Sequence, residues 1–88
     1  MFYKDVLLIW RYGNNTELQA TIHFYNEAKY NEFLKAQNKR NWLQVELGLN
    51  EKYFWNTYID IDGSYYQEVD NEVRLDREIK NADSFIIK

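Results

Sequence analysis

Apolar and polar residues alternate along residues 16–24, which predicts a strand with one buried face. Residues 2–12 contain the continuous apolar run from Val6 to Trp10, which is typical of a strand in the middle of a sheet. Between them lies Gly-Asn-Asn at 13–15, whose residue types tolerate the positive φ angles of a tight turn. We therefore expect the first two strands to form an antiparallel hairpin.

A helix is predicted to begin near Asn26, because this side chain can accept hydrogen bonds from the free amides of a first turn. Glu27 follows, where the positive end of the helix dipole favours a carboxylate. The sheet-facing side of this helix is expected to hold Tyr30, Phe33, Leu34 and Gln37. Asn38 or Asn41 is predicted to supply the left-handed residue that ends it.

Alternation resumes over residues 42–49, where every second residue from Leu43 is apolar, and it predicts a third strand. A fourth strand is predicted over 52–61. The dipeptide Asp62-Gly63 suits a two-residue type I′ loop, which would join the fourth strand to a return strand over 64–69. A turn at 70–71 and an extension over 72–75 would follow, although the apolar spacing between 64 and 80 also fits a helix. The apolar residues 85–87 predict a final short strand.

These elements predict an α+β fold in a single domain spanning residues 1–88. We expect an antiparallel sheet of about five strands, in the order β-β-α-β-β-β, with one helix packed on one face. A chain of 88 residues has room for one hydrophobic core. The predicted core consists of Leu18, Ala20, Ile22, Phe24, Phe33, Leu34, Leu43, Val45, Leu47, Ile59 and Ile61.

Cysteine is absent from the sequence, which excludes disulfides and thiolate metal sites. The apolar run from Val6 to Trp10 is too short for a signal peptide, and no stretch approaches the length of a membrane span. These features predict a cytoplasmic protein with no membrane partner.

Charge is distributed unevenly along the chain, whose formal net charge is −3. Residues 1–40 carry six Lys or Arg and four Asp or Glu, whereas residues 41–88 carry five and ten. The acidic second half would repel the phosphates of nucleic acid. A protein with a basic surface is the partner that this charge favours.

Few residues are suited to catalysis. His23 is the only histidine, which excludes a metal site with two histidines, and it falls on the polar side of its strand, where we expect it to be exposed. Because the sequence places no carboxylate beside His23, it predicts no pair of nucleophile and base. The only serines are Ser64 and Ser84. The sequence therefore predicts no enzyme activity, no cofactor and no metal.

Residues 59–64, Ile-Asp-Ile-Asp-Gly-Ser, resemble the first motif of the haloacid-dehalogenase-like phosphatases. The resemblance covers six residues beyond the middle of the chain, and too few residues follow for the parallel sheet of those enzymes. A calcium loop with Gly63 at its sixth position would need acids at Tyr58 and Val69. A hairpin turn with exposed acids is therefore the expected role of this segment.

Aromatic residues are the most informative feature of the composition. Sixteen of the 88 residues are Phe, Trp or Tyr, and six of these lie within residues 53–66. A two-residue loop at 62–63 would place Asp60 opposite Tyr65, and Ile59 opposite Tyr66. Tyrosines beside acids on an outer sheet face have the chemistry of a protein interface, although such pairs also stabilise sheets that bind nothing. The predicted partner-binding residues are Phe54, Tyr58, Asp60, Asp62, Tyr65 and Gln67.

The resulting functional prediction is a small acidic protein-binding module that occupies a basic surface of a host or cellular protein. The abundance of Asn, Lys, Ile and Tyr is similar in general character to the short accessory proteins of phages and mobile elements in AT-rich bacteria. Some of those proteins inhibit host defence enzymes. Two alternatives stay open: a homodimer or larger homo-oligomer formed through an open sheet edge, and a single-stranded nucleic-acid binder that stacks bases on exposed aromatics.

Overall fold

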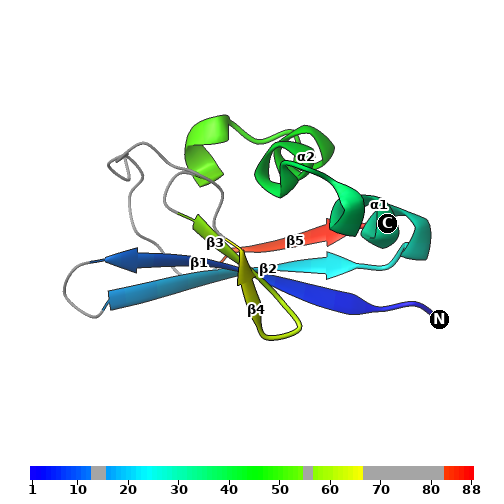
Figure 1. Ribbon diagram of the computed structural model, residues 1–88, viewed down its shortest axis with the longest axis horizontal. Coiled ribbons are helices and arrows are strands. Elements are labelled where there is room, and N and C mark those ends of the chain that lie inside the picture. Colours follow the sequence, from blue (N-terminus) through cyan, green and yellow to red (C-terminus); the bar gives the residue numbers. More distant parts are fainter. Residues whose placement is uncertain (13–15, 55–56, 67–82) are drawn as a thin grey trace.

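The computed structural model describes residues 1–12, 16–54, 57–66 and 83–88, and in this part of the chain two α-helices cover one face of a five-stranded sheet (Figure 1). The strands lie in the order β4-β3-β1-β2-β5. Their bounds are Lys4–Tyr12 for β1, Thr16–Phe24 for β2, Thr57–Ile61 for β3, Ser64–Tyr66 for β4 and Ser84–Ile87 for β5. The predicted α+β class is confirmed. The single predicted helix is replaced by α1 (Glu27–Lys35), α2 (Lys39–Leu47) and the short 3-10 helix η1 (Glu51–Phe54).

β1 is the central strand, as its continuous apolar run predicts. It pairs antiparallel with β2 on one side and with β3 on the other. Val6, Leu8 and Trp10 point toward the helices and are buried, while Ile9 on the opposite phase is only 2% exposed. Both faces of this strand therefore exclude water at its middle. The predicted turn at 13–15 lies outside the described residues.

α1 begins where the sequence predicts. The Asn26 side chain accepts a hydrogen bond from the Lys29 amide at 3.0 Å, which satisfies one free donor of the first turn. Tyr30 and Phe33 then pack on Phe24 of β2, with ring centroids 5.3 and 5.2 Å away. Leu34 is 37% exposed, so its predicted place in the core is wrong: the next residue along a helix points about 100° away from Phe33.

The predicted strand over 42–49 is wrong, because residues 39–47 form α2. Leu43 and Leu47 are four residues apart, a spacing that fits one face of a helix as well as one face of a strand. The caps decide between the two structures. Asn38 begins α2 by accepting from the Asn41 amide at 2.8 Å, and Gly48 ends it in the left-handed conformation. The role predicted for Asn38 or Asn41, ending the first helix, is therefore also wrong.

The Asp62-Gly63 hairpin is confirmed. Both residues have positive φ angles, 50° and 85°, as a type I′ loop requires. The loop places Asp60 opposite Tyr65 and Ile59 opposite Tyr66, which is the predicted register. The strand before the loop is shorter than predicted, because residues 51–54 form η1. Predictions for residues 67–80 lie outside the described residues.

The last strand, β5, is present as predicted but pairs parallel with β2, so the sheet is not purely antiparallel. This direction sets Phe85 beside Ile22, and Ile87 beside Phe24, on the side that faces the helices. Pairing with β2 thus adds two apolar side chains to the sheet face that is already buried.

The core is larger than predicted. Seven predicted members are buried: Ala20, Ile22, Phe24, Phe33, Leu43, Ile59 and Ile61. Leu18 and Leu47 are partly buried, and Val45 is 72% exposed because it lies on the solvent side of α2. The prediction missed Val6, Leu8, Ile9, Trp10, Tyr30, Phe54 and Ile87. Within the described residues, no helix has the length and hydropathy needed to cross a membrane.

Truncation of Phe33 is expected to destabilise the domain strongly. Phe33→Ala should lower the free energy of unfolding by about 3–5 kcal/mol, because it leaves a cavity between α1 and the sheet. Val45→Ala is the control, and it should change stability by less than about 0.5 kcal/mol at this exposed position. Urea denaturation measures both values. A large loss for Val45→Ala would contradict the helical assignment of residues 39–47.

The cap of α2 gives a second, local prediction. Asn38→Ala should cost about 1 kcal/mol of unfolding free energy, because the first turn loses its side-chain acceptor. Asn41→Ala places a better helix former inside α2 and should cost nothing or stabilise slightly. Thermal melts of the two variants make the comparison, and equal losses would show that Asn38 does not cap a helix.

Candidate functional site

The sheet has a second face, turned away from the helices, which we call the outer face. One row of its side chains crosses all five strands, with each residue opposite the next in the strand register: Tyr65, Asp60, Leu7, Thr21 and Ser84. The neighbouring row includes Asp5, His23 and Ile86. The outer face is defined here by these residues together with Tyr3, Tyr25 and Tyr58. Residues from the two ends of the chain therefore share one surface.

Three of the six residues predicted to bind a partner, Tyr58, Asp60 and Tyr65, lie on this face. Tyr65 is 56% exposed, Tyr58 and Asp60 are half-buried, and Asp62 is exposed in the loop. Phe54 does not belong to the set, because it is 2% exposed and packs against the Tyr53 ring in the core. It lies in η1, so the strand alternation that was used to place it outward does not apply. Gln67 lies outside the described residues.

Asp60 stabilises the hairpin. Its Oδ1 accepts a hydrogen bond from the Gly63 amide at 2.9 Å, across the loop that joins β3 to β4. Asp62 has no such role, and its carboxylate lies 3.8 Å from the Lys4 ammonium in an exposed ion pair, a kind of contact that contributes little to stability. Asp62 is therefore the acid on this hairpin that can be changed with the least effect on the fold.

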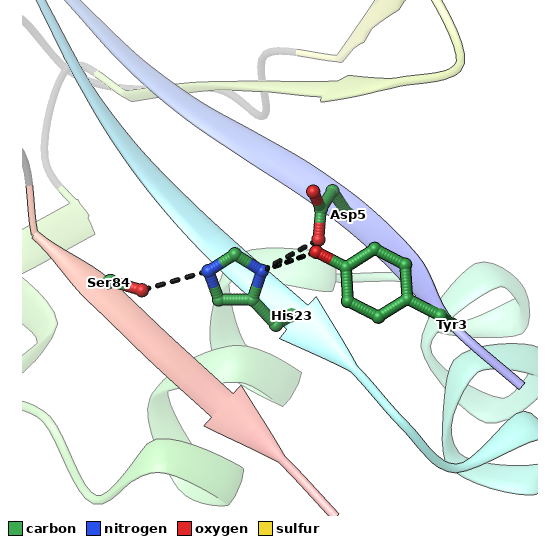
Figure 2. Close-up of polar contacts among 4 residues, drawn as sticks. All are labelled: Tyr3, Asp5, His23 and Ser84. Atoms are coloured by element: carbon green, nitrogen blue, oxygen red, sulfur yellow. Dashed lines mark hydrogen bonds and ion pairs between the residues drawn. The ribbon is translucent and has the colours of Figure 1, made fainter.

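A polar cluster that sequence reasoning missed lies at the other side of the outer face (Figure 2). His23 Nδ1 lies 2.7 Å from Asp5 Oδ1, and His23 Nε2 lies 2.9 Å from Ser84 Oγ. The Tyr3 hydroxyl lies 3.1 Å from the same Nδ1. The cluster joins β1, β2 and β5, and its polar atoms point toward the imidazole from both sides (Figure 2).

The partners of His23 fix its neutral tautomer. An ionised carboxylate can only accept hydrogen bonds, so Nδ1 must carry the ring proton that faces Asp5. Nε2 is then an acceptor, and the Ser84 hydroxyl donates to it. The Tyr3 hydroxyl lies beside the same nitrogen, on the side of the ring that faces Asp5. The imidazole is thus oriented by a carboxylate on one side and presents a basic nitrogen to a serine on the other.

The sequence placed His23 on the polar side of its strand, where it lies, but the expectation that no carboxylate is nearby is wrong. The imidazole is half-buried, and its partners lie 18 and 61 residues away along the chain. A signal for Asp5 existed: the predicted hairpin, if it closes at Tyr12 and Thr16, sets Asp5 opposite His23. No signal pointed to Ser84, because nothing in the sequence indicated that β5 would pair with β2.

Charge separates the two sides of the molecule. The outer face carries Asp5 and Asp60, whereas Lys29 and Arg40 of the helices make contacts in the helical layer. Lys29 pairs with Glu46, and Arg40 donates to the Phe54 carbonyl at 3.2 Å. Among the described residues, no three His, Asp or Glu side chains are placed to hold a metal ion. The outer face is thus an acidic surface bordered by exposed tyrosines and Ile86.

The pKa of the Tyr3 phenol is sensitive to the neighbouring Asp5. Its pKa is raised above the ordinary value of 10.0, chiefly by the hydrogen bond to Asp5 and further by partial burial and nearby negative charge. A raised pKa in the folded state means that the contribution of this group to stability is present below pH 10 and is lost as the pH rises through the folded-state pKa.

Asp5→Ala should therefore lower the pKa of Tyr3 toward 10.0, because it removes both the hydrogen-bond acceptor and its charge. A pH titration of the Tyr3 ring carbon by NMR measures the change. Glu17→Ala, an acid at the far end of the β1–β2 hairpin, is the control and should leave that pKa where it is. An unchanged Tyr3 pKa in Asp5→Ala would contradict the hydrogen bond.

Comparison of the chain with protein-family models, with curated proteins and with solved structures finds no match in any of the three. No relative therefore indicates which residues carry function. The chemistry of the outer face itself is the basis on which function can be inferred.

Proposed function

We propose that the protein acts by binding another protein through the outer face, and that the partner presents a basic surface. One observation carries this proposal: Tyr58, Asp60 and Tyr65 of the β3–β4 hairpin lie on the side of the sheet that the helices leave uncovered. The partner would be a host or cellular protein, and binding would require no catalysis.

The tyrosines supply the contact area. Tyr65, Tyr3 and Tyr25 are exposed on this face, and the last two contact each other with ring centroids 5.1 Å apart. Tyrosine buries a large apolar ring at little entropic cost and offers a hydroxyl at its tip, which is why it is frequent at the centre of interfaces. Ile86, 57% exposed, adds an aliphatic contact beside His23.

The acidic side chains of the outer face favour a partner with a basic surface. Asp60 on the hairpin and Asp5 beside His23 would give this surface a negative potential, and the two helices lie on the opposite side of the sheet (Figure 1). Complementary charge steers association and makes it sensitive to salt. The same acids disfavour the alternative in which the aromatics stack single-stranded nucleic acid, because such sites are lined by basic residues.

Within this proposal, the partner that fits best is an enzyme with a basic nucleic-acid groove. A short acidic protein that covers such a groove would inhibit the enzyme by occupying it. This mode of action suits an accessory protein of a phage or mobile element, the class that the composition resembles.

The test is recovery of partners from a nuclease-treated bacterial lysate by tagged protein at two salt concentrations. Tyr65→Ala should reduce recovery of a basic partner about tenfold or more, because it removes an exposed aromatic contact. Tyr66→Ala is the matched control: it is the same residue type on the next position of β4, and its ring lies on the helix side, 5.3 Å from the Lys39 ammonium.

Asp62→Asn should weaken recovery most at low salt, where charge attraction is strongest. Equal recovery by wild type, Tyr65→Ala and Asp62→Asn would show that the outer face is not the binding surface. Recovery of the protein alone, together with a dimer mass in light scattering, would replace the proposal by the homo-oligomer alternative.

A further inference from the structure

We infer that Ser84 is a base-activated nucleophile that accepts acyl groups from carboxylic esters, with His23 as its base and Asp5 as a positioning residue. The inference stands apart from partner binding, because it rests on the polar cluster alone. It assigns a chemical activity to three residues, of which Ser84 is brought to the other two only by the pairing of β5 with β2.

The geometry meets the two distance requirements of such a site. The nucleophile and the base are joined by a hydrogen bond of 2.9 Å, and the base and its orienting carboxylate by one of 2.7 Å. Both lie within the range of roughly 2.6–3.2 Å that proton transfer and orientation need. The order is carboxylate, Nδ1, Nε2, hydroxyl, which is the order used by hydrolases with a Ser-His-Asp triad.

The scaffold holds these groups in place. Each of the three side chains stands on a different strand, and in the register Asp5 is directly opposite His23. The Tyr3 hydroxyl lies 3.1 Å from His23 Nδ1, on the same side of the imidazole as Asp5 (Figure 2). Because Asp5 keeps the ring proton on Nδ1, the lone pair of Nε2 faces the Ser84 hydroxyl and is ready to accept its proton.

Ser84 is accessible to a reagent. It is exposed, and it lies on β5, the strand at one edge of the sheet. The Asp83 carbonyl accepts a hydrogen bond from the Thr21 amide at 3.0 Å, and the Ile87 carbonyl accepts one from the Tyr25 amide at 2.8 Å. In a parallel pair, residues of one strand turn their backbone groups alternately toward and away from the neighbouring strand. The Ser84 amide therefore points away from β2. Among the described strands none pairs with that edge, and the Ser84 N–H can donate to the oxyanion of an acyl intermediate.

The reaction is balanced with water as the only co-reactant. Ser84 Oγ attacks the ester carbonyl carbon while its proton passes to His23 Nε2, and the bond to the leaving alcohol breaks as Nε2 returns that proton to the leaving oxygen. Water then attacks the acyl-Ser84, again through His23, and releases the carboxylic acid and the free serine. Ile86, opposite His23 in the register, would contact an apolar acyl chain. Esters with apolar acyl groups are therefore the expected substrate class.

A fluorophosphonate probe tests the nucleophile directly, since it forms a bond between phosphorus and Oγ and releases fluoride. Wild-type protein should be labelled at Ser84, as located by peptide mass spectrometry. Ser64, the other serine of the chain, is exposed on β4 and serves as an internal control that should stay unlabelled. Absence of label from folded wild-type protein, or equal labelling of both serines, would overturn the inference.

His23→Gln should slow labelling by about 100-fold or more, because general-base assistance is lost. Ser64→Ala should label like wild type. Hydrolysis of p-nitrophenyl butyrate should likewise be as fast in Ser64→Ala as in wild type, and slower in His23→Gln. Labelling of Ser84 at the wild-type rate in a folded His23→Gln variant would show that the serine is not activated by the imidazole.

The positioning role of Asp5 has a readout of its own. Because His23 is the only histidine, nitrogen NMR reports its tautomer without assignment ambiguity. In wild-type protein with an uncharged His23, the ring proton should be on Nδ1. Asp5→Asn offers an amide donor to Nδ1, should move the proton to Nε2 and should slow labelling at least about tenfold. A tautomer that is unchanged by this substitution would refute the role of Asp5.

Discussion

The packing of aromatic rings on Phe24 determines which side of the sheet is buried. Phe33 from α1 and Trp42 from α2 both lie against this ring, with centroids 5.2 and 6.1 Å away, and Tyr30 closes the same cluster. Both helices are nine residues long, too short to be stable alone in water. Their stability therefore depends on this contact with β2. Because the helices pack there, the side chains on that face of the sheet form the core.

The other phase carries the polar residues of the sheet, although Ile9 on that phase is also buried. Strand alternation sends His23 outward because Ile22 and Phe24 point inward, and the register of β1 and β5 brings Asp5 and Ser84 to its two sides. The β3–β4 hairpin adds Tyr65 and Asp60 to the same surface. The proposed binding surface and the inferred nucleophile thus both depend on the same sheet, whose inward side chains are packed against the helices.

Local signals made part of this fold predictable. The alternation of β2, the cap at Asn26 and the loop at 62–63 each depend on residues within a few positions, and all three were confirmed. The strand predicted over 42–49 failed because apolar residues spaced by four suit a helix as well as a strand, and the capping residues Asn38 and Gly48 favoured the helix. Phe54 was misplaced outward for a related reason, since strand alternation was extended into a 3-10 helix.

The polar cluster was beyond local reasoning. Asp5 and His23 are related by a hairpin register that could have been counted, whereas Ser84 reaches His23 only through the parallel pairing of β5 with β2, across 61 residues of chain. Long-range pairing of this kind depends on the whole core, because β5 is placed by Phe85 and Ile87 packing beside Ile22 and Phe24. Sites assembled from such pairings leave little trace in a single sequence.

The division of the sheet into a packing face and a functional face is best tested along β2. Alanine would be introduced singly at Gln19, Thr21, Ile22, His23 and Phe24, and melting temperatures compared. Ile22→Ala and Phe24→Ala should each lower the melting temperature by about 10 °C or more, and the other three by less than about 5 °C. Equal losses on both phases would mean that the outer face is also a packing surface, and it would contradict the assignment of function to that face.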